Sequence, residues 1–242
     1  MTPEQARECG GIISDSFTEL ENNCFQGCEF TKIVIPTTIK ELPWYCFSHC
    51  NQLKEIEIPT SITRLGNSCF VYCKSIETLV IPTSVVKIEH YCFHGMASLK
   101  EIEVPTSVTE FGEGLFRYCS SLTSITLHNN YKAMKSEEFW GCSSLSSIEL
   151  PSTVTSIGYG VFGHCSSLSR IELPSAVTKL SNYAFACCSS LTSIDLSPVK
   201  EFDRGCFFDS GITKEKLKNI SVPDHCWESV DSSDDDSGSC SD

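Results

Sequence analysis

Cysteine is the most chemically versatile residue type in this chain, and its spacing is regular. The chain has 242 residues, of which 16 are cysteine. Seven of them stand three residues after a phenylalanine and are called here the first cysteine column: Cys28, Cys50, Cys73, Cys119, Cys142, Cys165 and Cys188. Five others stand immediately before a phenylalanine and form the second cysteine column: Cys24, Cys46, Cys69, Cys92 and Cys206. Regularly placed thiols can pack as small apolar groups, bind a metal or form disulfides.

Histidine next to cysteine is the one arrangement in the chain that suggests catalysis. His49 and His164 each precede a cysteine of the first column, as a thiolate–imidazole pair would require. However, adjacent residues in a turn tend to point in different directions. The sequence also has no phosphate-binding loop, no H-E-x-x-H segment and no nucleophile elbow. We therefore predict no catalytic residue, no cofactor and no enzyme activity.

The phenylalanines that set these columns recur along most of the chain. They are spaced by 22 or 23 residues: Phe25, Phe47, Phe70, Phe93, Phe116, Phe139, Phe162, Phe185 and Phe207. The repeated unit reads F-x-x-C-x-S-L-x-x-I-x-L-P-x-x-V-x-x-I. A unit this short cannot bury its own apolar face, so it is stable only when stacked on copies of itself. We predict a solenoid over residues 25–223, a capping segment over 1–24 and an acidic disordered tail over 224–242.

The two apolar parts of the unit predict two sides for each coil of the solenoid. The I-x-L step alternates as a strand does, and the proline after it ends the strand, which predicts a parallel sheet on one side. The V-x-x-I step, as in Val154 and Ile157, predicts a short strand or 3₁₀ turn on the other side. Thr2, Pro3 and Gln5 have the pattern of a capping box and predict a short helix over the open end of the stack.

Two segments identify a resemblance to a known repeat. Residues 156–162 (S-I-G-Y-G-V-F) and 183–191 (Y-A-F-A-C-C-S-S-L) closely match the repeat V-x-x-I-G-x-x-A-F-x-x-C-x-S-L-x-x-I-x-L-P. The chain thus resembles the BspA-like leucine-rich repeat family over about residues 12–223. The resemblance implies a leucine-rich repeat solenoid. Members are known as bacterial surface adhesins and in expanded sets in protists such as Entamoeba and Trichomonas, which implies a protist origin.

Within such a stack, we interpret both cysteine columns as buried thiols. Leu115, Val161 and Ala184 occupy the second column elsewhere, so that position accepts small or medium apolar groups, although Glu138 takes it in one unit. The spacing lacks the C-x-x-C pair of zinc sites, so we predict no metal. Neighbouring coils lie ~4.8 Å apart, which is a separation that a disulfide tolerates. Metal binding and disulfide formation remain the alternatives.

The outward positions of the predicted sheet carry a second kind of chemistry. One outward column contains five acids, called here the acid stripe: Glu57, Glu103, Glu149, Glu172 and Asp195. Like charges opposite one another destabilise a sheet, so we predict that the stripe binds a basic protein partner. The alternative is a solvated face that discourages aggregation. A second candidate surface is an aromatic edge of Tyr72, Tyr118, Trp140 and Phe208, with Trp140 as its leading residue.

Charge and hydropathy exclude several partner classes. The formal net charge is −13, whereas a nucleic-acid site needs clustered lysine and arginine. No apolar run is long enough to span a membrane, and the N-terminal residues lack the apolar core of a secretory signal, which predicts a cytoplasmic protein. Ser232, Ser233 and Ser239 in the tail have an acid three residues on, a pattern that acidophilic kinases accept.

Together these patterns predict a non-enzymatic protein–protein interaction module that binds its partner on the exposed strand side of the solenoid. Two alternatives remain. One is a cell-surface adhesin, which the family resemblance implies. The other is an acidic leucine-rich repeat regulator of a signalling enzyme or of a basic nuclear protein.

Overall fold

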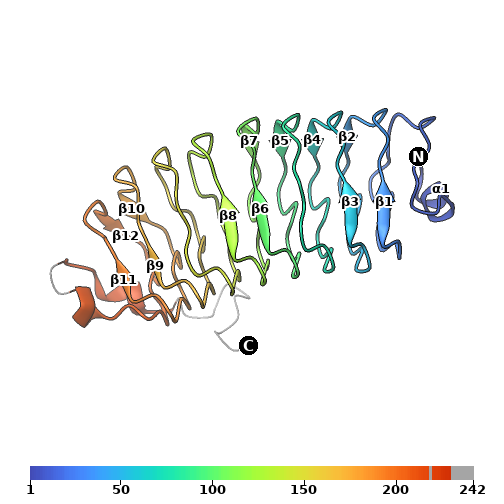
Figure 1. Ribbon diagram of the computed structural model, residues 1–242. Helices are drawn as coiled ribbons and strands as arrows, with labels where there is room; N and C mark the ends of the chain where they lie inside the picture. The colour runs from blue at the N-terminus through green and yellow to red at the C-terminus, as the bar shows by residue number, and fades with distance from the viewer. Residues whose placement is uncertain (218–219, 230–242) are drawn as a thin grey trace.

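The chain winds into a stack of similar coils, with the N-terminus at one end (Figure 1). The computed structural model describes residues 1–217 and 220–229. Residues paired between the strands of neighbouring coils are 22 or 23 positions apart, as in the pairing of Ile33 with Ile56. The predicted leucine-rich repeat solenoid, with parallel strands along its length, is confirmed.

One side of the stack, called here the strand face, carries the I-x-L segments. Its strands are β1 (Lys32–Val34), β3 (Glu55–Glu57), β6 (Glu101–Glu103), β8 (Ser124–Thr126), β9 (Arg170–Ile171) and β11 (Ser193–Ile194). They pair in parallel as β1 with β3, β6 with β8 and β9 with β11. The sheet that we predicted here is therefore present but divided into two-stranded parts.

Serines before the strand position connect coils where the pairing is interrupted. The N–H of Ser144 donates to the carbonyl of Ser120 at 3.1 Å, and the N–H of Ser167 donates to the carbonyl of Ser143 at 3.2 Å. The hydroxyl of Ser143 also donates to the carbonyl of Ser120 at 3.3 Å. Side-chain and backbone hydrogen bonds of the S-S-L segment thus continue the stack without a regular strand.

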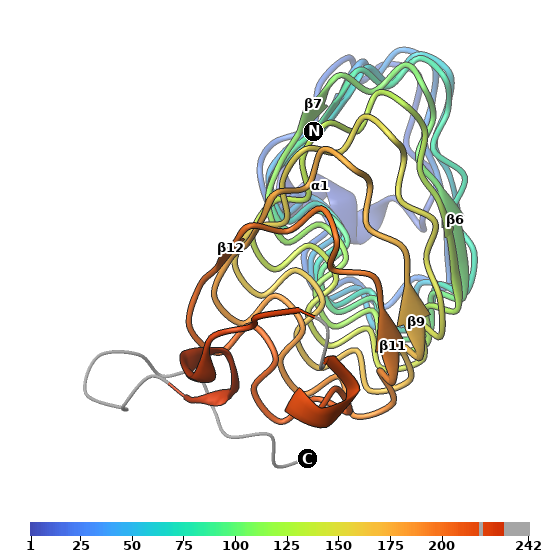
Figure 2. The same cartoon turned by 90° about the vertical axis from the view of Figure 1, so that its left-hand side faces the viewer.

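The opposite side, called here the second face, carries the V-x-x-I segments. Its strands are β2 (Glu41–Leu42), β4 (Arg64–Leu65), β5 (Lys87–Ile88), β7 (Glu110–Phe111), β10 (Lys179–Leu180) and β12 (Glu201–Phe202). The first four form one parallel sheet, and β10 pairs with β12. The short strands predicted for this side are confirmed. Figure 2, which looks along the stack, shows the two faces on opposite sides of flattened coils.

Phenylalanine rings fill the interior between the two faces. All nine phenylalanines of the repeat are buried. Consecutive rings stack along the array, with centroid separations from 5.3 Å between Phe47 and Phe70 to 6.1 Å between Phe70 and Phe93. Each ring within the array therefore packs between two neighbouring rings, which a single unit could not provide.

A tight turn holds each phenylalanine, and it places residues on either side in the left-handed region. In one coil, Tyr45 has φ 56° and His49 has φ 59°, and equivalent residues flank the other phenylalanines. The left-handed conformation costs an L-residue ~1–2 kcal/mol. It also directs the N–H groups of Tyr45, Phe47 and His49 toward the next coil, where they donate at 2.8–2.9 Å. Hydrogen bonds between coils thus offset the local strain.

A helix covers the N-terminal end of the stack, as predicted. Helix α1 (Pro3–Glu8) starts with a capping box between Thr2 and Gln5, and its Ala6 side chain is buried. Among the described residues, no helix combines the length and apolar composition that crossing a membrane requires.

Two 3₁₀ helices close the C-terminal end, η1 (Lys214–Leu217) and η2 (Asp224–Trp227). In η2, Cys226 is buried, and the ring of Trp227 lies 6.0 Å from that of Phe207. The pair C-W therefore replaces the pair C-F of the repeat. For Asp224–Trp227, the predicted disordered tail is wrong. The phosphorylation candidates Ser232, Ser233 and Ser239 lie outside the described residues and stay predictions.

Candidate protein-binding surface

The strand face presents all five carboxylates of the acid stripe to solvent. Glu57 and Glu103 end β3 and β6, where the alternation of the strand turns the intervening isoleucine inward. Glu149, Glu172 and Asp195 occupy the same place in later coils and are also exposed. The structure thus brings the predicted acids onto one face.

Only some of these carboxylates have a countercharge. Glu172 lies 2.8 Å from Arg170, and Glu103 lies 3.0 Å from the imidazole of His128, which is a countercharge only when protonated. Asp195 accepts a hydrogen bond from the backbone N–H of Ser197 at 2.9 Å, which lowers the pKa of Asp195. Within residues 1–217 and 220–229, Glu57 and Glu149 form no salt bridge. The face therefore carries uncompensated negative charge.

An open hollow of about 530 Å³ lies on this face. The preceding coil contributes Thr78 and Val80 to its wall, β6 contributes Glu101 and Glu103, and β8 contributes further polar groups: Ser124 and Thr126. Sequence reasoning selected Glu103 but missed Glu101. The sequence does indicate Glu101, because it precedes Glu103 by two residues and a strand directs both side chains to the same side.

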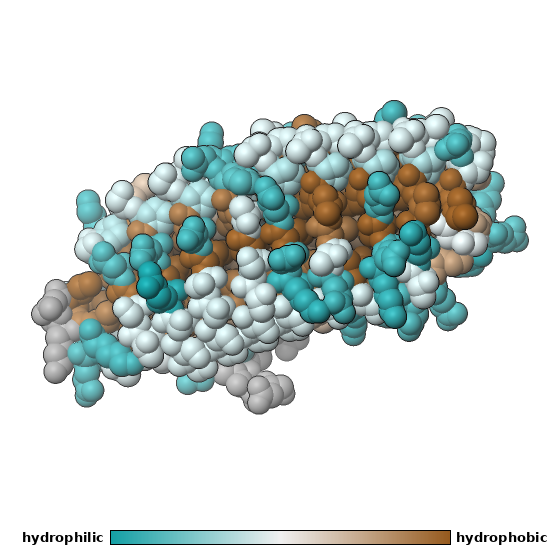
Figure 3. Space-filling model, viewed as in Figure 1, coloured by the Kyte–Doolittle hydropathy of each residue, from teal (hydrophilic) through white to brown (hydrophobic). Residues whose placement is uncertain are grey.

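Apolar side chains are exposed beside the acids. Figure 3 shows a band of hydrophobic residues running lengthwise along the strand face, bordered by hydrophilic groups. Val80 is 80% exposed, Ile12 67% and Val34 43%. A contiguous exposed apolar surface with a polar border is characteristic of interaction sites.

Trp140 does not belong to an exposed surface. Its side chain is only 8% exposed, and its ring lies 4.8 Å from the ring of His164. Two glycines of the next coil make this burial possible, because a Cβ at Gly160 or Gly163 would lie 2.7 or 2.3 Å from the indole. Trp140 is therefore a packing residue, and its selection as the leading aromatic binding residue is wrong.

The rest of the aromatic edge is partly exposed and tightly packed. Tyr118 is exposed, whereas Tyr72 and Phe208 are half-buried. The hydroxyl of Tyr72 lies 3.1 Å from Nε2 of His94. Burial, together with the nearby Arg117, lowers the pKa of His94 to about 4, so this imidazole is neutral near pH 7.

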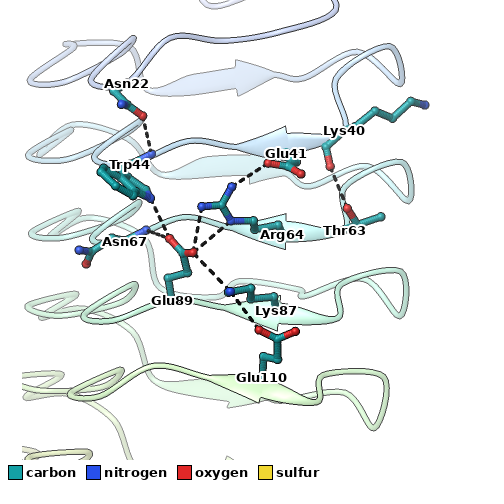
Figure 4. A network of polar contacts seen from close by, with 10 residues as sticks. All are labelled: Asn22, Lys40, Glu41, Trp44, Thr63, Arg64, Asn67, Lys87, Glu89 and Glu110. Carbon is teal, nitrogen blue, oxygen red and sulfur yellow. Dashed lines mark hydrogen bonds and ion pairs between the residues drawn. The ribbon is translucent and has the colours of Figure 1, made fainter.

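A separate polar cluster on the second face joins β2, β4, β5 and β7 (Figure 4). Glu89 is at its centre and accepts hydrogen bonds from Nη2 of Arg64 at 2.9 Å and from Nε1 of Trp44 at 2.8 Å. Arg64 also pairs with Glu41, and Lys87 pairs with Glu110, each at 2.9 Å. Because these charges compensate one another, the cluster stabilises the four-stranded sheet and leaves little charge for a ligand.

The first cysteine column forms a ladder of hydrogen bonds. The thiol of Cys165 donates to the carbonyl oxygen of Phe139 in the preceding coil at 3.2 Å, and burial raises the pKa of Cys165 to about 12. The neighbouring His164 packs on Trp140. No group of three or more metal-ligating side chains is found in the part of the chain that the structure describes.

Comparison with known proteins places these features in a family. The model of the BspA type leucine rich repeat region matches six copies over residues 18–142 and 109–232. A leucine-rich repeat protein from Bacteroides ovatus has a TM-score of 0.73 and 28% identity, and the match covers 81% of this chain and 51% of that one. The present chain thus spans about half the length of that protein.

Two further solved structures are similar. A leucine rich repeat protein from T. pallidum has a TM-score of 0.59 and 27% identity, covering 65% of this chain and 76% of its own. The pneumococcal vaccine antigen PcpA has a TM-score of 0.60 and 21% identity, covering 82% and 59%. Comparison with curated proteins finds no match. These structures are bacterial, and the protist origin stays a prediction. The family model matches most of the chain, which therefore belongs to the BspA-type leucine-rich repeat family.

Proposed function

We propose that this chain is a non-enzymatic protein-interaction module that binds a basic, extended segment of a partner protein on its strand face. The observation that carries the proposal is the hollow beside Val80, which Glu101 and Glu103 line. A lysine or arginine of the partner fits this hollow, because its aliphatic stem can lie along Val80 while its cationic head reaches the carboxylates.

Electrostatic repulsion within the face supports a cationic partner. Glu101 and Glu103 project from the same side of β6, and Glu57 and Glu149 add charge along the stack without forming a salt bridge in the described ranges. Like charges on one sheet face repel each other, and a bound cation reduces that repulsion. The stripe thereby favours a basic partner over an acidic one.

Synthetic peptides test the charge preference directly. We expect a short fluorescent peptide of alternating lysine and valine to bind the protein, with fluorescence anisotropy as the readout. Affinity should fall as salt concentration rises, because exposed charge pairs are screened. A matched peptide of alternating glutamate and valine should not bind.

Variants of the hollow locate the binding site. The double variant E101Q/E103Q should weaken binding of the lysine peptide by about 10-fold or more, which corresponds to ~1.4 kcal/mol. The control E19Q/E21Q removes two exposed charges that lie before the first strand. If the control weakens binding as much as the hollow variant does, the peptide responds only to net charge and the proposal fails.

The remaining acids of the stripe define how far the surface extends. The triple variant E149Q/E172Q/D195N leaves the hollow intact while it neutralises the later coils. A longer lysine–valine peptide should lose affinity in this variant, whereas a peptide that fills only the hollow should not. Equal binding of both peptides would limit the surface to the coils around the hollow.

A cell-surface adhesin is the second candidate. The similar solved structures are bacterial proteins, and one of them is a vaccine antigen. Labelling the lysines of intact source cells with a membrane-impermeant reagent separates the two readings. Labelled protein would favour the adhesin, and labelling only after lysis would favour the cytoplasmic module.

A further inference from the structure

The first member of the cysteine column differs from the others in its hydrogen-bond partner. From Cys50 onward, each thiol of the column donates to the carbonyl oxygen of the phenylalanine in the preceding coil, as Cys50 does to Phe25 at 2.9 Å. Cys28 belongs to the first coil, and helix α1 replaces an earlier coil beneath it. Its thiol instead contacts the thiol of Cys50, with the two Sγ atoms 3.0 Å apart.

The two cysteines differ in their exposure to solvent. Cys50 is buried, whereas Cys28 is partly exposed at the end of the column. The later column members Cys142 and Cys165 are both fully buried. An oxidant in solution therefore meets Cys28 first, and the thiol next to it is that of Cys50.

We propose that Cys28 and Cys50 are a site of reversible oxidation, at which a peroxide forms a disulfide that joins the first coil to the second. The Cys28 thiol reduces the peroxide and becomes a sulfenic acid, with release of water. The sulfur of Cys50 then attacks the sulfenic sulfur, and the hydroxyl group leaves with the thiol proton as a second water. Two thiols thus lose two electrons to one peroxide.

The bond would fasten the part of the solenoid that has the fewest neighbours. The first coil has a complete coil on one side only, with the shorter capping segment on the other, so we expect it to separate from the stack before the central coils do. A covalent link between Cys28 and Cys50 closes a loop about as long as one repeat and restricts the unfolded chain. Oxidation should therefore raise thermal stability, and a reductant should reverse the rise.

Formation of the disulfide between Cys28 and Cys50 should be slow at neutral pH. The thiolate is the reactive form of cysteine. The hydrogen bond to Cys50, together with burial, raises the pKa of Cys28. The site would consequently respond to sustained oxidation, and disulfide formation should accelerate as the pH is raised.

Peptide mapping of the full chain tests the pairing. The protein is treated with hydrogen peroxide, its remaining thiols are alkylated, and it is digested without reductant. Trypsin cleaves after Lys32 and Lys40, so Cys28 and Cys50 fall in different peptides. We expect a cross-linked pair of these peptides whose fragments assign the bond to Cys28 and Cys50, together with a rise in melting temperature of about 5 °C.

Matched variants separate this site from general oxidation. C28S and C50S should both lose the cross-link and the rise in melting temperature, whereas C165S should keep both. C28S alters a partly exposed residue, so it tests the proposal even if C50S fails to fold. The proposal is overturned if Cys28 is oxidised while Cys50 remains open to alkylation, or if Cys50 pairs with Cys73 instead.

Discussion

The thiol of Cys142 donates a hydrogen bond of 3.1 Å to the carbonyl oxygen of Phe116 in the coil before it. The same oxygen accepts the backbone N–H of Cys119 at 3.0 Å. A cysteine at this position therefore supplies both a buried apolar atom and a donor between coils. An aliphatic side chain of similar size would supply only the first.

Truncation of this thiol should destabilise the stack. We expect C142A to lower the free energy of unfolding by about 1–3 kcal/mol, because it removes the hydrogen bond to Phe116 and leaves a small cavity. Urea unfolding followed by circular dichroism measures the loss. The control S146A alters an exposed residue and should change stability by less than ~0.5 kcal/mol. Equal stability of the two variants would show that the thiol donor contributes nothing.

Glu89 should stabilise the second face through its charge. Burial raises the pKa of Glu89, but the hydrogen bonds from Arg64 and Trp44 outweigh it, so the pKa is lower than usual. A carboxyl whose pKa falls on folding adds stability above its unfolded pKa of about 4.5 and loses it as the pH decreases. At pH 7 we expect E89Q to cost about 1–3 kcal/mol, because Arg64 loses its partner.

The pH dependence of that cost is the discriminating measurement. The difference between E89Q and the unchanged protein should shrink as the pH falls below about 4.5, because protonation of this carboxyl in the unfolded chain then favours unfolding. The control E110Q removes the exposed partner of Lys87 and should cost less than ~1 kcal/mol at any pH. A constant difference for E89Q across this range would contradict a role for its charge.

Spacing was enough to predict the phenylalanine core, because its nine buried rings recur with the repeat. Phe47 and Phe70, for example, differ by one repeat and stack in the structure. The charge cluster around Glu89 has the same signal, since Glu41, Arg64 and Lys87 are each 23 residues apart, but the predicted outward columns were those of the strand face alone.

Trp140 shows where spacing is insufficient. Its position after a phenylalanine is shared by exposed and buried residues in other coils, so the repeat alone does not determine its environment. Burial depends on Gly160 and Gly163, which lie in the next coil and leave space for the indole. Such a pairing is recognisable only when the two coils are compared position by position.

An alanine in place of Gly163 should therefore disturb the packing of Trp140. Its Cβ would lie 2.3 Å from Cε3 of the indole, so the ring or the coil has to move. We expect G163A to cost about 1–3 kcal/mol in unfolding experiments. In the double variant W140A/G163A the clash is absent, so its cost should be smaller than the sum of the two single costs. If the costs of the two single variants simply add, the destabilisation by G163A does not come from a clash with Trp140.

Glu138 is a carboxyl group in the apolar interior, and it makes folding sensitive to pH. It is fully buried in the second cysteine column, where its Oε1 accepts a hydrogen bond of 2.7 Å from the hydroxyl of Tyr131. The other carboxyl oxygen has no partner among the described residues. Burial raises the pKa of Glu138 to about 8, so the folded protein holds a proton that the unfolded chain releases above about pH 4.5.

The sign of the effect follows from that proton. Between pH 4.5 and pH 8 the folded state binds more protons than the unfolded state, so the free energy of unfolding decreases as the pH rises. In E138Q, a neutral amide replaces the carboxyl and can still accept the hydrogen bond from the hydroxyl of Tyr131. The stability of E138Q relative to the unchanged protein should therefore rise by a few kcal/mol between pH 4.5 and pH 8. Urea unfolding at pH 4.5, 6 and 8 measures the difference, with the exposed E149Q as the control whose difference stays flat. If the difference in stability between E138Q and the unchanged protein also stays constant with pH, Glu138 is ionised in the folded protein. The core would then already compensate the cost of burying its charge.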